Sequence, residues 1–271
     1  MTANGQILLI GFGNMGQALV RGWVGTGRAA SGIHVVDPVA ASRAVAAELG
    51  VAAHAEIAEV SGHADVVVLA VKPNQLAAVL PTCAAAAAAD AVFLSIAAGK
   101  TIAQLGAGLP RNAAIVRAMP NTPAAIGKGM TALVANPAVS SAQRALCGDL
   151  LAAVGAVAWL DDERHMDAVT AISGSGPAYV FLLIECLEQA AIDLGLDAAL
   201  AKQLAIATVA GAGEYAAAAS EAAAVLRQRV TSPNGTTQAA LNVLMAETGM
   251  RELLTRAARA AAERSRELAT V

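Results

Sequence analysis

The chain has 271 residues, enough for one large domain or two smaller ones, and 56% of them are hydrophobic but only 3% aromatic. A formal net charge of -3 excludes a basic surface for nucleic acid or an acidic membrane, and the few aromatic residues exclude a base-stacking platform. The mean hydropathy of +0.57 is high because the chain contains many alanines. The purest apolar runs, 66–71 and 179–184, are far shorter than the ~20 residues that a membrane span requires.

The first 160 residues alternate short β-rich runs with alanine-rich helical segments. Strands are predicted at 6–10, 33–37, 66–71, 92–96, 114–119, 130–135 and 157–160. Helical periodicity occurs between them at 17–25, 40–49 and 75–88. Such alternation predicts a doubly wound, mostly parallel sheet with helices on both faces, and the near-continuous apolar strands agree with a sheet that is covered twice.

After about residue 161 the sequence predicts helices alone, at 164–194, 198–219, 221–230, 236–247 and 250–268. Gly195 is placed to end the first helix, Asp197 to cap the second and Ser220 to cap the third. We therefore expect an α/β domain over residues 1–162 and an all-α domain over 163–271. Because these helices are apolar on most sides, they predict a homodimer built from the second domain, with a well-packed monomeric bundle as the alternative.

The first predicted strand runs directly into a glycine-rich turn, Gly11-Phe12-Gly13-Asn14-Met15-Gly16, and a helical segment follows. In such a turn the first glycine permits the tight bend, the second lets the backbone approach a pyrophosphate, and the third allows close helix packing. The helix N-terminus offers its amides to the diphosphate. These six residues are predicted to bind a dinucleotide in a Rossmann-like domain.

The second predicted strand ends at Asp37 and Pro38, about twenty residues beyond the turn. An acidic residue here accepts a hydrogen bond from the adenine ribose and favours NADH. Ser42 and Arg43 lie near enough in sequence to serve the 2′-phosphate of NADPH instead, and Asp37 also suits a strand-end turn or a helix N-cap. The predicted cofactor is therefore NADPH or NADH, with Asp37 and Pro38 among its ligands.

Three later strands end in proline, glycine or polar residues, at the sheet edge where open α/β folds bind ligands. The residues assigned to the cofactor on this ground are Ala70, Val71, Lys72, Pro73, Ala97, Ala98, Gly99 and Asn121. Lys72 either reaches the nicotinamide region or is solvated at the strand end.

Two unusual stretches interrupt the helical half, Ser173-Gly174-Ser175-Gly176-Pro177 and Thr231-Ser232-Pro233-Asn234-Gly235-Thr236-Thr237. Amides and hydroxyls at helix N-termini suit a substrate carboxylate, whereas a helix kink and a capped loop are the simpler explanations. Together with the preceding motifs, these stretches resemble the pyrroline-5-carboxylate reductase family from about residue 6 to residue 268. Asn234 replaces that family's usual glycine, and because Asn tolerates a left-handed backbone we expect the loop to keep its shape.

The resemblance implies a reductase that gives hydride to the C5 imine of 1-pyrroline-5-carboxylate, the last step of proline biosynthesis. It implies that Ser232, Gly235 and Thr236 hold the ring carboxylate and that the catalytic Thr237 hydrogen-bonds the ring nitrogen, donating a proton or only orienting the ring. Ser175 and Gly176 are predicted to be further substrate-binding residues. The expected partners are this small molecule and a second copy of the chain. The dimers could assemble further into a larger oligomer.

A protonated imine is already electrophilic, so positioning can supply much of the rate without a histidine or lysine acid. Two other functions stay open: a reductase of a 3-hydroxy acid or another imine, and a nucleotide sensor without catalysis. A hydroxy-acid reductase would need a lysine in 168–194 to polarise the alcohol, and that segment holds none. A nucleotide sensor would leave both interrupting stretches unexplained. The scattered cysteines and histidines predict no metal site, and the absence of a basic leader before the first strand predicts a cytoplasmic protein.

Overall fold

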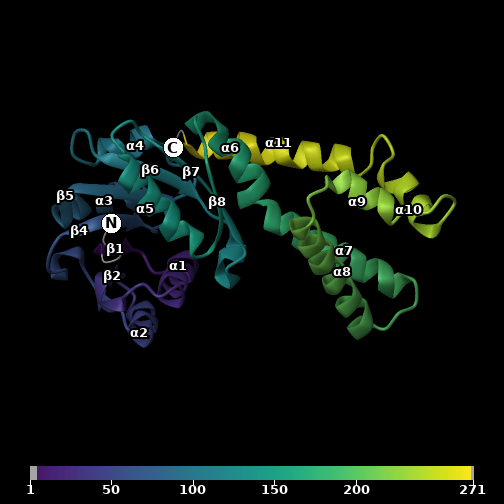
Figure 1. Cartoon of the computed structure of the whole chain (residues 1–271), viewed down its shortest axis with the longest axis horizontal. Helices are drawn as coiled ribbons and strands as arrows, with labels where there is room; N and C mark the ends of the chain where they lie inside the picture. Colours follow the sequence, from purple (N-terminus) through teal and green to yellow (C-terminus); the bar gives the residue numbers. More distant parts are fainter. Residues whose placement is uncertain (1–4, 270–271) are drawn as a thin grey trace. The chain divides into compact units, whose positions relative to one another are not determined.

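The protein is described by a computed structural model over residues 5–269. It forms two compact units, Met1–Gly174 with Ala262–Val271 and Ser175–Ala261, which we call the sheet unit and the helical unit (Figure 1). The chain leaves the sheet unit after Gly174 and returns to it within the last helix, α11 (Met250–Ala269).

The sheet unit extends beyond the expected boundary at residue 162 because several side chains tie later residues to it. The carboxylate of Glu163 accepts hydrogen bonds from Arg117 Nη1 at 2.7 Å and from the amide of Ile102 at 2.8 Å. Ser265 in α11 donates to the carboxylate of Asp167 at 2.6 Å. Gln104 Nε2 donates to the carbonyl of Ala269 at 2.8 Å. The last turn of α11 is therefore part of this unit.

The sheet has eight strands in the order β3-β2-β1-β4-β5-β6-β7-β8. They are β1 (Ile7–Ile10), β2 (Ile33–Val36), β3 (Ala52–His54), β4 (Ala64–Leu69), β5 (Ala87–Ser95), β6 (Ala114–Met119), β7 (Gly129–Ala135) and β8 (Gly155–Trp159). Every neighbouring pair is parallel except β6 and β7, which are antiparallel. The mostly parallel sheet is thus confirmed, and β3 is a strand that the sequence did not predict.

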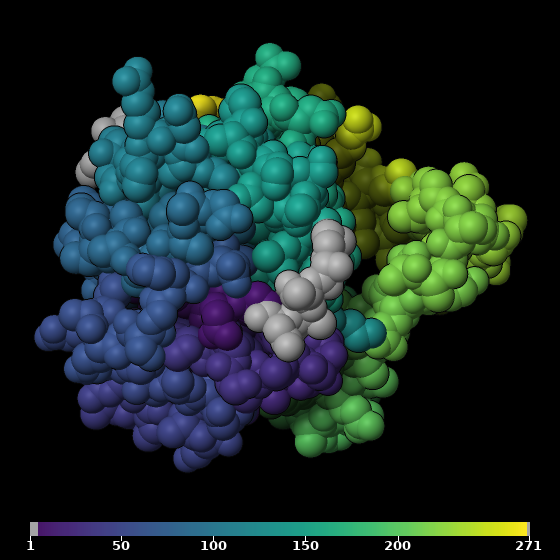
Figure 2. Space-filling view, turned by 60° about the vertical axis from the view of Figure 1, so that its left-hand side comes forward, coloured from purple at the N-terminus to yellow at the C-terminus, as the bar shows by residue number. Residues whose placement is uncertain are grey.

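Alternate side chains of the strands enter two separate cores, one on each face of the sheet. Leu9 and Val68 face the core formed with α1 (Asn14–Gly25), α2 (Ala40–Glu48) and α5 (Ser141–Ala152). Leu8 and Val67 face the core formed with α3 (Leu76–Ala85) and α4 (Ile102–Ala107). Figure 2 shows the purple start of the described chain enclosed by blue and teal segments on one face. Helices on both faces confirm the doubly wound architecture.

The helical unit continues from a short helix of the sheet unit. In the sheet unit, α6 (Met166–Val169) leads into a π-helical turn (Thr170–Gly174). The helical unit then consists of α7 (Gly176–Asp193), α8 (Ala198–Ala218), α9 (Ala223–Arg229), α10 (Thr236–Leu244) and the first part of α11. As predicted, Gly195 ends α7 with φ +94°, and Asp197 caps α8 by accepting from the amides of Ala199 and Leu200. The predicted cap at Ser220 is wrong, because α9 begins after Ala222.

The helical unit exposes much apolar surface within the single chain. Phe181 is 57% exposed, Leu194 85% and Val243 73%. By length and composition alone, the continuous helix Glu163–Asp193 could cross a membrane, and only 6% of its apolar window is buried. This helix contains polar residues, so it does not stand out in the sequence as one uninterrupted apolar run. A single helix of this kind is a weak indication of a membrane, because a helix that packs against a partner has the same composition.

A histidine pair joins β2 to β3 and makes the stability of the sheet unit depend on pH. His34 Nδ1 and His54 Nε2 lie 3.2 Å apart, and burial, with a smaller effect of the His54 charge, lowers the pKa of His34 below 6.5. The folded protein therefore favours neutral His34, whereas His34 in the unfolded chain binds a proton more readily. The contribution of neutral His34 to the free energy of unfolding is complete above pH 6.5 and is lost as the pH falls below it.

We expect the free energy of unfolding in urea to decrease between about pH 7.5 and about pH 5.5, and His34→Gln to reduce that decrease by less than about 1 kcal/mol, since the pair is partly solvated. An unchanged pH dependence in His34→Gln would show that the pair does not contribute.

Candidate cofactor and substrate sites

A cleft of about 1110 Å³ lies at the carboxyl ends of β1, β2 and β4. Its lining includes eight of the residues predicted to bind the cofactor: Gly11, Phe12, Gly13, Asp37, Pro38, Ala70, Val71 and Lys72. Strand order changes direction around β1 in this sheet, since β2 and β3 lie on one side of it and β4 on the other. Open α/β sheets bind dinucleotides at such a switch point.

The three glycines of the first turn meet different surroundings. Gly11 has φ +93°, and a Cβ there would lie 2.7 Å from the carbonyl oxygen of Ala70. A Cβ on Gly16 would lie 2.6 Å from the carbonyl oxygen of Gly11. Around Gly13, however, a Cβ would meet no described atom within 4 Å. The fold therefore needs glycine at the first and third positions, while the open space at the second fits a bound ligand.

The turn also presents a helix N-terminus to the cleft. Gly13 is the N-cap of α1 and provides no side-chain cap, and Gln17 donates to its carbonyl at 2.9 Å. The amides of Asn14, Met15 and Gly16 precede that first bond and have no intrahelical acceptor. Together with the helix dipole, they form a site suited to a diphosphate.

Asp37 braces the turn from the end of β2. This side chain is only 8% exposed. One carboxylate oxygen accepts from the amide of Phe12 at 2.7 Å, and the other from the amide of Val39 at 2.9 Å. Arg43 Nη1 donates to the carbonyls of Asp37 and Pro38 at 2.9 and 2.8 Å. The strand-end turn role considered for Asp37 is therefore present, while α2 begins after Val39 without a side-chain cap.

The other residues assigned to the cofactor lie at or near the same sheet edge but do not line this cleft. Pro73 follows Lys72, and Ala97, Ala98 and Gly99 follow β5. Gly99 has φ +71°, and a Cβ there would lie 3.2 Å from Leu268 Cβ, so this glycine also has a structural role. Asn121 follows β6, and its side chain forms hydrogen bonds with Ser173 and Met130.

The sequence did not predict several cleft residues as cofactor ligands. They are Val39, Glu56, Ile57 and His63, among others, and Ser42, which was considered only for a phosphate, also lines the cleft. Glu56, Ile57 and His63 come from the segment after β3. Since that strand has only three residues, no alternation marked where it ended, and the segment could not be assigned to the ligand-binding edge.

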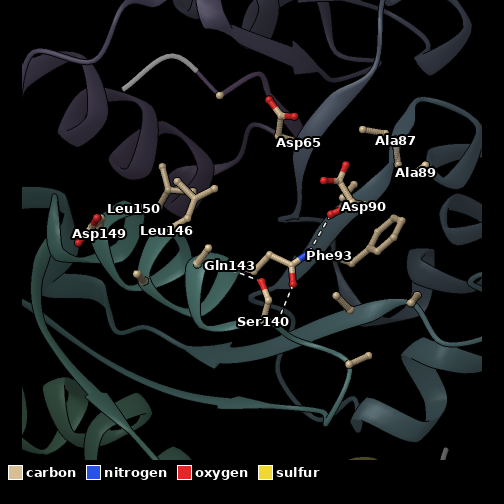
Figure 3. Close-up of a pocket in the computed structure, with 18 of the residues that line it drawn as sticks. Asp65, Ala87, Ala89, Asp90, Phe93, Ser140, Gln143, Leu146, Asp149 and Leu150 are labelled. Atoms are coloured by element: carbon tan, nitrogen blue, oxygen red, sulfur yellow. Dashed lines mark hydrogen bonds between the residues drawn. The ribbon is translucent and has the colours of Figure 1, made fainter. Parts of the chain in front are cut away.

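A second hollow, of about 1270 Å³, lies at the opposite edge, around the amino ends of β4, β5 and β6. Figure 3 shows Asp65, Asp90 and Asp149 around it, with Gln143 donating to the carbonyl of Asp90 at 2.7 Å. Arg28 and Arg111 also line this hollow, so charge does not distinguish it from the first cleft, but ligands of such sheets bind at the carboxyl edge. The smaller cleft is therefore the cofactor site that the geometry favours.

The buried thiols of the sheet unit are not nucleophiles. Burial raises the pKa of Cys83 to about 11 and that of Cys147 to about 12. Both thiols are therefore protonated near neutral pH and unreactive.

In the helical unit, the loop before α10 has the features expected of an anion site. Asn234 has φ +58°, the left-handed conformation expected for it, and the amide of Gly235 donates to the carbonyl of Ser232 at 3.0 Å. Gly235 is the N-cap of α10 and provides no side-chain cap. The amides of Thr236 and Thr237 thus begin a helix without intrahelical acceptors, and the Thr237 side chain is partly exposed.

The other predicted substrate residues begin α7. Ser175 is its N-cap without a side-chain cap bond, Gly176 is its first residue, and Pro177 follows. Ser175 instead accepts, through its carbonyl, a hydrogen bond from the amide of Ala178 at 3.0 Å. The structure thus places the loop around Ser232 at the N-terminus of α10, and Ser175 and Gly176 at the junction between the π-helical turn and α7.

Comparison with known proteins finds relatives over nearly the whole chain. Residues 163–268 match the family described as pyrroline-5-carboxylate reductase dimerisation, and residues 6–99 match the family described as NADP oxidoreductase coenzyme F420-dependent. The chain is similar to a pyrroline-5-carboxylate reductase of Pseudomonas aeruginosa, with 45% identity over 265 residues and 97% of both sequences. A protein of the same name from Haemophilus influenzae is 40% identical over 98% of both sequences.

Solved structures agree with the sequence comparison. A pyrroline-5-carboxylate reductase from Coxiella burnetii is 37% identical, covers 98% of both chains and has a TM-score of 0.93. A pyrroline carboxylate reductase from Plasmodium falciparum, solved with NADP bound, is 28% identical, covers 99% of this chain and all of the other, and has a TM-score of 0.85.

Proposed function

Because the chain belongs to the pyrroline-5-carboxylate reductase family, we infer that it reduces the C5 imine of 1-pyrroline-5-carboxylate to L-proline with NADPH or NADH. The observation that carries this function is 45% identity over 97% of both sequences. The matched region includes both the dinucleotide cleft and the loop before α10, which are the proposed cofactor and substrate sites. A nucleotide sensor would need only the dinucleotide cleft.

The cofactor residues fit a dinucleotide. The space around Gly13 and the first amides of α1 suit the diphosphate, and Asp37, Pro38, Ala70, Val71 and Lys72 line the rest of the cleft. Bound reduced nicotinamide supplies the hydride. Asn14, Met15, Gly16, Pro73, Ala97, Ala98, Gly99 and Asn121 complete the predicted set. Asp37 disfavours a 2′-phosphate by its charge, whereas Arg43 lies beside it. Comparing kcat/KM for NADPH and NADH decides the preference.

The substrate is held by the helical unit in this proposal. Amides and hydroxyls of Ser232, Gly235 and Thr236 bind the ring carboxylate at the N-terminus of α10, with Ser175 and Gly176 as further contacts. Thr237 hydrogen-bonds the ring nitrogen. Its hydroxyl can accept from a protonated imine and can donate to the amine of the product, so it can either orient the ring or hold the proton.

The assembly that fits the exposed apolar helices is a homodimer. A helical unit in which α7 buries none of its residues, and α8 only Ala201 and Ala205, needs a partner surface to be stable. We expect gel filtration with light scattering at micromolar concentration to give about twice the chain mass of 27.0 kDa, or a multiple of that dimer. A monomer under these conditions would contradict the assignment.

The proposed dimer interface explains why the helix Glu163–Asp193 is apolar without placing it in a membrane. The net charge of -3 provides no positive field that would attract nucleic acid. A cytoplasmic enzyme acting on a small molecule is therefore the proposed setting.

One assay tests the function against its rivals. The purified protein is mixed with NADPH or NADH and 1-pyrroline-5-carboxylate, and the loss of absorbance at about 340 nm is followed. Rapid oxidation of the cofactor with formation of proline supports the proposal. Oxidation only with another imine or a keto acid would favour the related reductases, and cofactor binding without turnover would favour the sensor.

A further inference from the structure

The side chain of Asn121 joins three elements of the sheet unit. Asn121 follows β6, and its Oδ1 accepts from the amide of Met130 at 2.9 Å, at the start of β7. Its Nδ2 lies 3.2 Å from the carbonyl oxygen of Ser173 and 3.3 Å from the Ser173 hydroxyl oxygen. Both ends of this partly buried amide are thus used inside the protein, and one end holds the π-helical turn Thr170–Gly174.

The sequence explains why the turn needs an outside donor. In an α-helix the carbonyl of Ser173 would accept from the amide of residue 177, four positions later. Residue 177 is proline and has no amide hydrogen. The next amide, that of Ala178, donates to the carbonyl of Ser175 at 3.0 Å. Asn121 therefore supplies the hydrogen bond that Pro177 removes from the helix.

A second contact brings the same two segments together. A Cβ on Gly174 would lie 2.5 Å from Met119 Cε, so the turn packs directly against the flexible end of the Met119 side chain at the end of β6. The residues after Gly174 are Ser175 and Gly176, which the proposed function assigns to the substrate. The turn is thus joined directly to the segment that carries those residues.

We propose that Asn121 is a positioning residue, which replaces the helical hydrogen bond lost at Pro177 and thereby fixes the π-helical turn that precedes the substrate-binding segment. This inference rests on the proposed function. It moves Asn121 from direct cofactor binding, its expected role, to support of the substrate-binding segment. Because small displacements of positioning groups can lower rates roughly hundredfold, its loss should affect the imine more than the cofactor.

The test compares Asn121→Ala with Asn136→Ala. Asn136 is the residue after β7, and its side chain also bonds to β6, but at the other edge of the sheet. Its Oδ1 accepts from the amide of Ile115 at 3.1 Å, and its Nδ2 donates to the carbonyl of Ala113 at 2.8 Å. We expect Asn121→Ala to lower kcat/KM for the imine ten- to roughly hundredfold, while the dissociation constant of NADPH, measured by fluorescence without substrate, changes less than about threefold. Asn136→Ala should lower the melting temperature similarly and keep kcat/KM.

Two more measurements separate positioning from general destabilisation. In the Pro177→Ala background an amide is restored, so Asn121→Ala should cost at least about threefold less in kcat/KM than it does alone. Hydrogen exchange of the turn amides should accelerate in Asn121→Ala but not in Asn136→Ala. That readout does not need turnover, so an inactive wild-type protein would refute the function and leave the positioning result intact.

The proposal is overturned if Asn121→Ala keeps kcat/KM within about twofold, or weakens NADPH binding as much as it lowers kcat/KM, or if Asn136→Ala shows the same loss. Equal costs of Asn121→Ala with and without Pro177 would also overturn it, because the missing helical amide would then not be what Asn121 replaces.

Discussion

Replacing Gly13 with valine is expected to weaken NADPH binding at least a hundredfold, about 2.8 kcal/mol, while the protein stays folded. The reason is the contrast among the glycines of the first turn. A Cβ at Gly13 meets no described atom within 4 Å, and φ is -73°, which any residue adopts. Valine therefore fits the protein without cofactor but fills the space proposed for the diphosphate. Fluorescence titration with NADPH measures the loss.

Two other glycines serve as controls for this variant. Gly25 lies at the far end of α1, also without an atom within 4 Å of its Cβ position, so Gly25→Val should keep NADPH affinity. Gly16→Ala should instead lower the melting temperature, because its Cβ would lie 2.6 Å from the Gly11 carbonyl oxygen. Tight NADPH binding by Gly13→Val would refute the placement of the diphosphate.

Removing the hydroxyl of Thr237 is expected to lower kcat at least about tenfold. A positioned side chain that transfers a proton typically raises the rate roughly a hundredfold or more, and one that only orients the ring contributes less. Thr237 is the second residue of α10, so alanine keeps the helix and its amides while it deletes the group proposed to contact the ring nitrogen. The dissociation constant of NADPH should change little. Steady-state kinetics with saturating NADPH and imine, together with fluorescence titration, separates the two effects.

Thr237→Ser keeps a hydroxyl and should retain most of the turnover. Thr255 in α11 supplies a matched control, since it is another helical threonine whose hydroxyl donates to the carbonyl of Arg251 at 2.8 Å, so Thr255→Ala should leave kcat unchanged. Unaltered turnover in Thr237→Ala would remove this hydroxyl from the mechanism and leave only the amides of the loop.

The sequence located the strands that are long and apolar, because burial on both faces leaves few polar residues in them. It missed β3, whose three residues, Ala52–His54, pair with β2 alone. It could not give the strand order or the antiparallel β7, which depend on pairings between distant segments. Two helices it missed did carry a signal. Thr101 with Gln104, and Ser140 with Gln143, are capping boxes that mark the starts of α4 and α5.

The motifs of the candidate site were predictable, but not what each residue contacts. The glycines from Gly11 to Gly16 have the spacing that the turn requires, and that spacing is visible in the sequence. That both oxygens of Asp37 accept from backbone amides depends on where β1 and β2 place Phe12 and Val39. The bond from Asn121 to Ser173 joins residues 52 positions apart. No local pattern reveals such a pairing, since it arises only from packing.

The return of α11 to the sheet unit has a consequence for how the protein is made on the ribosome. The bonds from Ser265 to Asp167 and from Gln104 to the carbonyl of Ala269 join α11 to segments 98 and 165 residues earlier in the chain. Nascent domains usually fold in order as they emerge from the exit tunnel. Here the sheet unit, although begun first, cannot be completed until α11 has left the exit tunnel, so its closure follows synthesis of the whole helical unit.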